Sequence, residues 1–277
     1  MPWLFLLIVL AVCLVLCAVG FYKFVYFLSI GYGFAVAGGG IAIFIIALAN
    51  GWLTSLPLIL LALAQMALFI AYGARLSGFL LIREIKNAAY RNTLKEATGD
   101  DKKIPVFVLA TIWIFCAILY AMQVSPMLFN YYNLSLTGDI NYVVTIVGMV
   151  ISVFGLVLES IADQQKSAQK KENPNMVATK GLYKIVRCPN YLGEIIFWTG
   201  VFVAGVATYS GVGQWIIAII AFICIVYIMF NGAQRLEKRQ MKRYGNDDEY
   251  NKYADTTPII IPLLPIYHLN KKETEEK

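Results

Sequence analysis

The chain has 277 residues, of which 59% are hydrophobic and only 14% are charged. Soluble domains of this length carry roughly 25% charged residues, so the composition excludes a soluble globular protein. No acidic residue precedes Glu84, which rules out a soluble core for the first quarter of the chain. The net charge of +6 does not indicate nucleic-acid binding, because the basic residues gather in links between apolar segments.

Seven segments are long and apolar enough to cross a bilayer, since about 20 apolar residues span its hydrocarbon core as a helix. We predict these spans at residues 3–22, 25–49, 53–79, 104–125, 140–160, 191–209 and 212–231. The predicted fold is therefore an all-α integral membrane protein with about seven transmembrane helices. The first segment lacks the basic start of a signal peptide, so we expect it to be retained.

The links between the predicted spans alternate in their content of lysine and arginine. The links 50–52, 126–139 and 210–211 contain none, whereas the links 80–103 and 161–190 and the tail after 231 carry most of the 23 basic residues. The positive-inside rule predicts that the basic links face the cytosol. The N-terminus is then outside and the C-terminal tail cytosolic.

The second predicted span is rich in glycine, with Gly31, Gly33, Gly38, Gly39 and Gly40. A dinucleotide fingerprint requires a preceding strand and a βαβ unit, and a bilayer span offers neither. Close helix packing through small residues explains these glycines better.

Cysteine and histidine limit the chemistry further. The five cysteines are scattered, which does not indicate a disulfide framework. The only histidine is His268 in the tail, so a histidine-based metal site or catalytic triad inside the membrane is excluded, and we expect no metal.

The segment from Glu159 to Glu194 contains candidate catalytic and binding side chains. Glu159 and Asp163 share one face where the fifth span leaves the membrane. Glu194 begins an apolar span, and an ionisable group inside a span is by default a functional-site hypothesis. The alternative is a headgroup-zone acid favoured by the helix dipole. Pro189 suits a helix start, and the Asn190 amide offers one acceptor and two donors to a planar amide.

The segment from 234 to 265 is the second candidate. Arg235 and Arg239 share a face with Lys238 and Lys242, as in a phosphate-binding surface or an amphipathic surface helix. The apolar stretch 258–265 is too short and too rich in proline to span a bilayer. We expect it either to dip into the membrane interface or to cap a site.

Three stretches, 162–166, 181–183 and 187–194, resemble the steroid 5-alpha-reductase superfamily, especially its bacterial-type branch of unknown function. The tail from Tyr250 to Pro262 and the exit of the third span at 74–83 fit as well, although the resemblance is specific only over 159–198. It implies seven helices that enclose NADPH from the cytosolic side. It also implies hydride transfer to an electron-poor carbon–carbon double bond beside a ketone, in a bacterial cell membrane rather than the endoplasmic reticulum.

The resemblance also implies roles for particular residues. The expected cofactor-binding residues are Asn190 and Glu194 near the nicotinamide carboxamide, Asp163, Lys170, Tyr183 and Trp198 lining the pocket, and Arg235 and Arg239 near the phosphates. Tyr72 matches a tyrosine that hydrogen-bonds the substrate carbonyl, where a phenol donor stabilises developing negative charge as an oxyanion hole does. The alternative for Tyr72 is an aromatic residue of the membrane interface.

Two departures from the family pattern leave alternatives open. Cys188 stands where the family commonly has histidine, and the glutamate that pairs with the tyrosine in animal steroid reductases is absent. Either Tyr72 acts alone, or Asn50 or Gln65 assists it, or the substrate differs.

Two other functions compete with the reductase. One is an S-adenosylmethionine-dependent carboxyl methyltransferase of the isoprenylcysteine type, whose pattern has a histidine and two adjacent glutamates where this chain has Cys188 and a lone Glu237. The other is a lipid- or sterol-binding membrane protein without catalysis.

The sequence therefore predicts one polytopic domain over 1–277. We expect residues 1–125 to form the substrate side, 140–265 the cofactor side and 266–277 a charged tail. The predicted function is NADPH-dependent reduction of a lipidic enone such as a 3-oxo-Δ4 steroid. The expected partners are that lipidic substrate and membrane lipid, and not nucleic acid.

Overall fold

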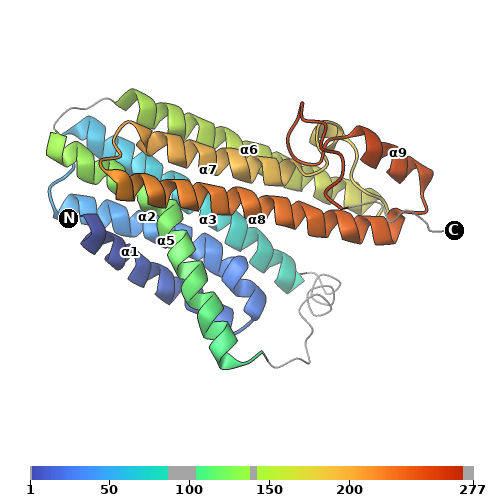
Figure 1. Cartoon of the computed structure of the whole chain (residues 1–277), viewed down its shortest axis with the longest axis horizontal. Coiled ribbons are helices and arrows are strands. Elements are labelled where there is room, and N and C mark those ends of the chain that lie inside the picture. Colours follow the sequence, from blue (N-terminus) through green and yellow to red (C-terminus); the bar gives the residue numbers. More distant parts are fainter. Residues whose placement is uncertain (1, 87–103, 138–141, 271–277) are drawn as a thin grey trace. The chain divides into compact units, whose positions relative to one another are not determined.

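The computed structural model describes residues 2–86, 104–137 and 142–270 of the chain. Within these ranges every regular element is a helix and no strand occurs (Figure 1). The α-helices are α1 (Pro2–Cys17), α2 (Ile30–Ala49), α3 (Leu56–Lys86), α5 (Val106–Thr137), α6 (Tyr142–Glu172), α7 (Pro189–Val206), α8 (Val212–Tyr244) and α9 (Asp248–Thr256). Three short 3₁₀ helices are η1 (Ala18–Phe21), η2 (Phe24–Leu28) and η3 (Gly181–Lys184).

Six of the described helices are long and apolar enough to cross a membrane, namely α1 with η1, α2, α3, α5, α6 and α8. Helices satisfy their own backbone hydrogen bonds, which a bilayer core requires. The shorter α7 is not among the six, because its first turns carry Pro189, Asn190 and Glu194. The predicted all-α, multi-pass membrane fold is confirmed, and about seven spans agrees with it. Which side is cytosolic stays a prediction.

The chain divides into two compact units. Unit 1 comprises Met1–Met149 and Val201–Ala221, and unit 2 comprises Val150–Gly200 and Phe222–Lys277. The predicted division into a substrate side and a cofactor side stays a prediction.

In unit 1, α2 contacts three neighbouring helices through its glycines. A Cβ at Gly33 would lie 2.8 Å from the carbonyl oxygen of Gly73 in α3, closer than carbon and oxygen approach. Gly38, Gly39 and Gly40 lie against side chains of α1, α5 and α3, respectively. The prediction that these glycines serve helix packing is confirmed.

Helix α5 continues to Thr137, beyond the predicted span, so the described part of the predicted link 126–139 is helical. Pro126 has no N–H to bond the carbonyl oxygen of Met122. The hydroxyl of Ser125 donates to that oxygen instead, at 2.7 Å, and the helix goes on. Beyond this point Asn133 is buried and donates to the carbonyl oxygen of Thr208 at 2.8 Å.

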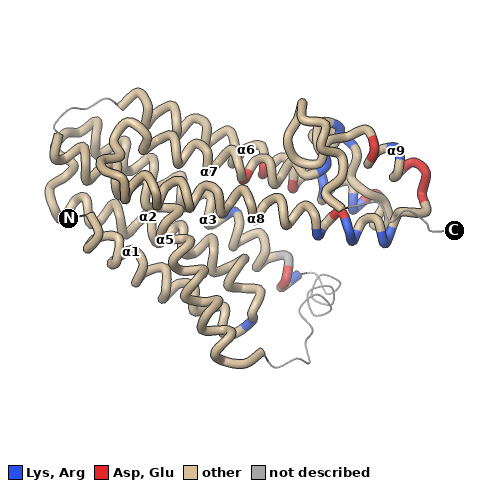
Figure 2. The backbone as a smooth tube through the Cα atoms, in the orientation of Figure 1, with Lys and Arg blue, Asp and Glu red and all other residues tan. Residues whose placement is uncertain are grey.

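Charged residues gather at one end of the helices within each unit (Figure 2). In unit 1, Lys23 pairs with Glu84 at the end of α3, and the hydroxyl of Tyr26 donates to the same carboxylate at 2.8 Å. In unit 2, the charges lie along the ends of α6 and α8 and on α9. Among the described residues, the opposite ends carry no lysine, arginine, aspartate or glutamate.

Candidate functional site

In unit 2, α7 begins at Pro189, as predicted, and buries Glu194 one turn later. The Glu194 side chain is only 4% exposed. Its Oε1 accepts a hydrogen bond from Nε1 of Trp198 at 3.0 Å. Glu194 is therefore not a solvated acid of the headgroup zone. Burial of a carboxylate is unfavourable unless its oxygens are bonded, and Trp198 supplies such a bond.

Glycines fix the turn that carries Glu194. A Cβ at Gly193 would lie 2.8 Å from the Cβ of Glu159 on α6. A Cβ at Gly155 would lie 2.4 Å from the backbone nitrogen of Phe197. The α6 and α7 backbones therefore touch at these glycines, which holds Glu194 in a fixed position relative to α6.

Asn190 lies one turn before Glu194 and is half-buried. Within the described part of the chain, its side-chain amide makes no hydrogen bond. An amide with one acceptor and two donors complements a carboxamide, so its chemistry fits the predicted nicotinamide contact.

Tyr183 and Asp163 lie close together. The Tyr183 ring is buried, and its hydroxyl donates to the carbonyl oxygen of Ala162 at 3.3 Å. Burial and, secondly, the Asp163 carboxylate raise the pKa of Tyr183. Tyr253 on α9 donates to the Tyr183 carbonyl oxygen at 2.6 Å, which ties η3 to the tail.

Arg235 and Arg239 are exposed on α8. The Tyr191 ring lies against Gly232, 3.4 Å from the position of a Cβ there, and both arginines follow one and two turns later. Both guanidinium groups are close enough to act electrostatically on Tyr191. The structure thus brings these two predicted phosphate ligands to the start of α7.

Lys170 is already engaged. Its ammonium donates to the carbonyl oxygens of Pro174, at 3.1 Å, and Met176, and to the hydroxyl of Tyr244 at 3.1 Å. An ammonium has three donors, so these bonds use all of them. In the described structure, Lys170 stabilises the turn that follows α6. Its position beside a cofactor stays a prediction.

In unit 1, Tyr72 is fully buried on α3, so it is not an aromatic residue of the membrane interface. Its ring meets the Tyr32 ring edge-on at 5.8 Å. Gln65 lies two helical turns away, roughly 10.5 Å along the axis, and accepts from Tyr131 instead. Asn50 bonds the carbonyl oxygen of Ile46 at the end of α2. Neither amide is placed to assist Tyr72 directly.

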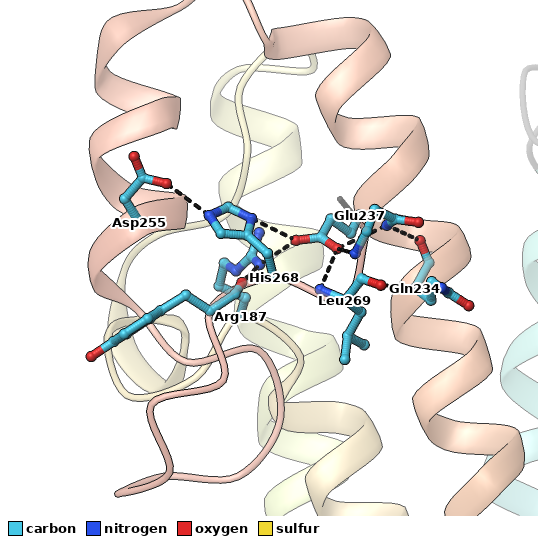
Figure 3. Close-up of polar contacts among 8 residues, drawn as sticks. Arg187, Gln234, Glu237, Asp255, His268 and Leu269 are labelled. Atoms are coloured by element: carbon cyan, nitrogen blue, oxygen red, sulfur yellow. Dashed lines mark hydrogen bonds and ion pairs between the residues drawn. The ribbon is translucent and has the colours of Figure 1, made fainter. Parts of the chain in front are cut away.

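The sequence did not predict the ion pair between Arg187 and Glu237 (Figure 3). Arg187 is 4% exposed and Glu237 is 1% exposed. Glu237 also accepts from the backbone N–H groups of Leu269 and Asn270, at 2.9 and 3.0 Å. Nδ1 of His268 lies 3.0 Å from the same carboxylate. The segment 267–270 is therefore fastened to α8 and to the residue before Cys188.

The apolar stretch 258–265 covers the start of α7. The backbone N–H groups of Arg187 and Cys188 donate to the carbonyl oxygens of Pro258 and Ile259, both at 2.8 Å. The Cys188 side chain packs against Ile259 and Ile260. Both predicted roles for this stretch, a dip into the membrane interface and a cap over a functional site, stay predictions, and the structure shows that it packs over the start of α7. The sequence signals that bear on the ion pair are an arginine beside the motif and a single acid in a basic helix, and they do not by themselves pair the two residues.

Comparisons with known proteins identify the family. The model of the family described as "Protein of unknown function (DUF1295)" matches residues 34–257, and the chain belongs to this family. The "Steroid 5-alpha-reductase DET2" of Arabidopsis thaliana is 33% identical over 121 residues, which cover 43% of this chain and 41% of that protein. The chain is thus a member of the steroid 5-alpha-reductase superfamily, as the resemblance implied. No solved structure matches it.

Proposed function

We propose that this protein is a membrane-embedded, NADPH-dependent reductase that acts on the activated carbon–carbon double bond of a lipidic enone, such as a 3-oxo-Δ4 steroid. We place it in a bacterial cell membrane with its C-terminal tail in the cytosol. The observation that carries the proposal is the pair on successive turns of α7. Glu194 is a buried carboxylate, and Asn190 is a half-buried amide with no partner among the described residues.

The residues of unit 2 fit the proposed cofactor. Asn190 and Glu194 offer the donors and acceptor that a carboxamide pairs with. Arg235 and Arg239 are exposed guanidinium groups, which suit phosphate oxygens. Bound there, NADPH would supply a hydride. The remaining residues that we expect to line it are Asp163, Lys170, Tyr183 and Trp198.

Tyr72 would act on the substrate. Its hydroxyl would donate to the enone carbonyl oxygen, where negative charge builds as the double bond is reduced. The residue is fully buried on a membrane-spanning helix, and a hydrogen bond to developing charge is strongest where water is excluded.

The environment of Glu237, the lone glutamate where the methyltransferase pattern has two, does not favour the methyltransferase alternative. This carboxylate is occupied by Arg187 and by the backbone of the tail. Cys188, in the place of the methyltransferase histidine, is buried under Ile259.

The proposal is tested with purified protein, NADPH and a panel of enone steroids. We expect wild type to consume NADPH, Glu194→Gln to weaken NADPH binding at least tenfold, and Tyr72→Phe to bind NADPH normally but turn over about 100-fold more slowly. Glu249→Gln, an exposed acid on α9, is the matched control and should behave as wild type.

Two outcomes would contradict the proposal. Binding of S-adenosylmethionine without binding of NADPH would indicate the methyltransferase. Binding of NADPH and steroid without turnover would indicate a lipid-binding protein that has no catalytic activity.

A further inference from the structure

One buried polar side chain of unit 1 has no bonding partner among the described residues. Gln123 on α5 is 2% exposed, and both its Nε2 and its Oε1 are enclosed without a hydrogen-bond partner among the described residues. Inside a membrane protein no bulk water can satisfy such an amide, so burial in this state is costly. A side chain kept there at that cost is a candidate to bind a ligand.

The matching glutamine on the neighbouring helix behaves differently. Gln65 on α3 is 1% exposed, and its Oε1 accepts from the hydroxyl of Tyr131 at 2.9 Å. Gln65 therefore joins α3 to α5, whereas Gln123 makes no such bond. The contrast shows that this unit can satisfy a buried glutamine where it serves packing.

Gln123 faces the interior of unit 1 and not the lipid. The next residue, Val124, packs against Gly39 of α2. Two turns further along the same face, Asn130 donates to the hydroxyl of Thr145 on α6 at 3.2 Å. These contacts place Gln123 on α5 between the side that faces α2 and the side that faces α6.

Gln123 is also linked to Tyr72 by a short series of contacts. Tyr120 lies one turn before Gln123 and stacks on Tyr32 at 4.6 Å. Tyr32 in turn meets Tyr72 at 5.8 Å. Two ring contacts and one helical turn thus separate Gln123 from Tyr72. This series of contacts allows a separation as large as the length of a fused four-ring lipid.

We propose that Gln123 is a specificity-determining residue that binds a hydroxyl group at the end of the substrate opposite to the enone. An amide offers one donor and one acceptor side by side, and a hydroxyl pairs with both. A ketone would pair only with Nε2, and a hydrogen substituent with neither. This inference rests on the proposed function and narrows its substrate to enone lipids with a distal hydroxyl.

The test compares three 3-oxo-Δ4 steroids that differ only at the distal end, bearing a hydroxyl, a ketone or no oxygen. In wild type we expect kcat/KM to fall in that order, by at least about tenfold from first to last, because a missing partner leaves the amide unpaired. Gln123→Met should bring the three substrates within about twofold of one another. It should also raise the Tm of the ligand-free protein, because the unpaired amide is removed.

Gln65→Met is the matched control. It should lower the Tm, because it breaks the bond to Tyr131, and it should keep the substrate order. If Gln123→Met also lowers the ligand-free Tm, or keeps the wild-type order, Gln123 is structural and the inference is wrong while the reductase stands. If wild type neither binds nor reduces any of the three steroids, the inference and the steroid substrate both fail.

Discussion

The guanidinium of Arg187 donates to the carboxylate of Glu237 at 2.7 Å, although 50 positions separate the two residues and both are buried. The same carboxylate holds the segment after Tyr267 through two backbone N–H groups. One ion pair thus connects the start of α7, the middle of the basic part of α8 and the tail.

Removal of one partner of this pair should destabilise the protein strongly. Glu237→Ala would leave the Arg187 guanidinium buried without its counter-ion, which typically costs about 3–5 kcal/mol. We expect a large fall in Tm, whereas Lys238→Ala, at the exposed neighbouring position, should change it little. The double variant Arg187→Met/Glu237→Leu should lose less than the sum of the two single variants. An unchanged Tm for Glu237→Ala would show that the pair does not hold the tail.

The contact between α6 and α7 should not tolerate a methyl group. Gly193→Ala would place a Cβ 2.8 Å from that of Glu159, and separation of the helices should cost about 1–3 kcal/mol. Since the next residue is Glu194, NADPH affinity should fall as well. Gly78→Ala is the control, because a Cβ there meets nothing within 4 Å in the described structure, and it should be neutral or stabilising. Equal Tm values for the two variants would refute the close crossing.

Cys188 should resist alkylation in the folded protein. Burial raises the pKa of its thiol from 9.0 to about 12. Only the thiolate reacts, and a higher pKa leaves roughly a thousandfold fewer thiolates at neutral pH, so labelling should be slow and should accelerate as the pH rises. Maleimide labelling followed by mass spectrometry of the peptide measures the rate. Ile259→Asp, which disrupts the cap, should expose the thiol and speed labelling. Fast labelling of the intact protein would show that the stretch 258–265 does not cover it.

Variants of Lys170 and Arg239 should separate the stability of the turn after α6 from the recognition of the cofactor phosphates. Lys170→Met removes bonds to Pro174, Met176 and Tyr244, so it should lower the Tm while the preference for NADPH over NADH stays unchanged. Arg239→Met changes an exposed side chain and should keep the Tm while it weakens NADPH binding about tenfold. Thermal unfolding and cofactor titration on the same samples measure both effects. The reverse pattern would assign the phosphate contact to Lys170.

Hydropathy predicted the spans because a bilayer imposes length and apolarity on each helix independently of its neighbours. Hydropathy did not give the full length of α5, which continues through Pro126 although local rules indicate a helix end there. There the hydroxyl of Ser125 bonds the carbonyl oxygen of Met122 that proline leaves free. A rule that considers only proline's missing N–H cannot anticipate this compensation.

The candidate site was predictable where one short motif carries it. Asn190, Gly193 and Glu194 lie within two helical turns, so their common position follows from sequence spacing alone. The pair of Arg187 with Glu237 was not predictable, because it depends on how α8 and the tail return to the start of α7. Similarly, only the packed structure distinguishes Gln65, which has a partner, from Gln123, which has none among the described residues.

The polar first turns of α7 have a consequence for how the chain enters the membrane. The insertion machinery retains a segment by its own apolarity, and the start of α7, with Asn190 and Glu194, is weaker in this respect than the six other candidate spans. Its backbone touches α6 at Gly155 and Gly193. A helix with so polar a start gains the most from a partner helix, and the close contact at these two glycines gives it α6 as that partner.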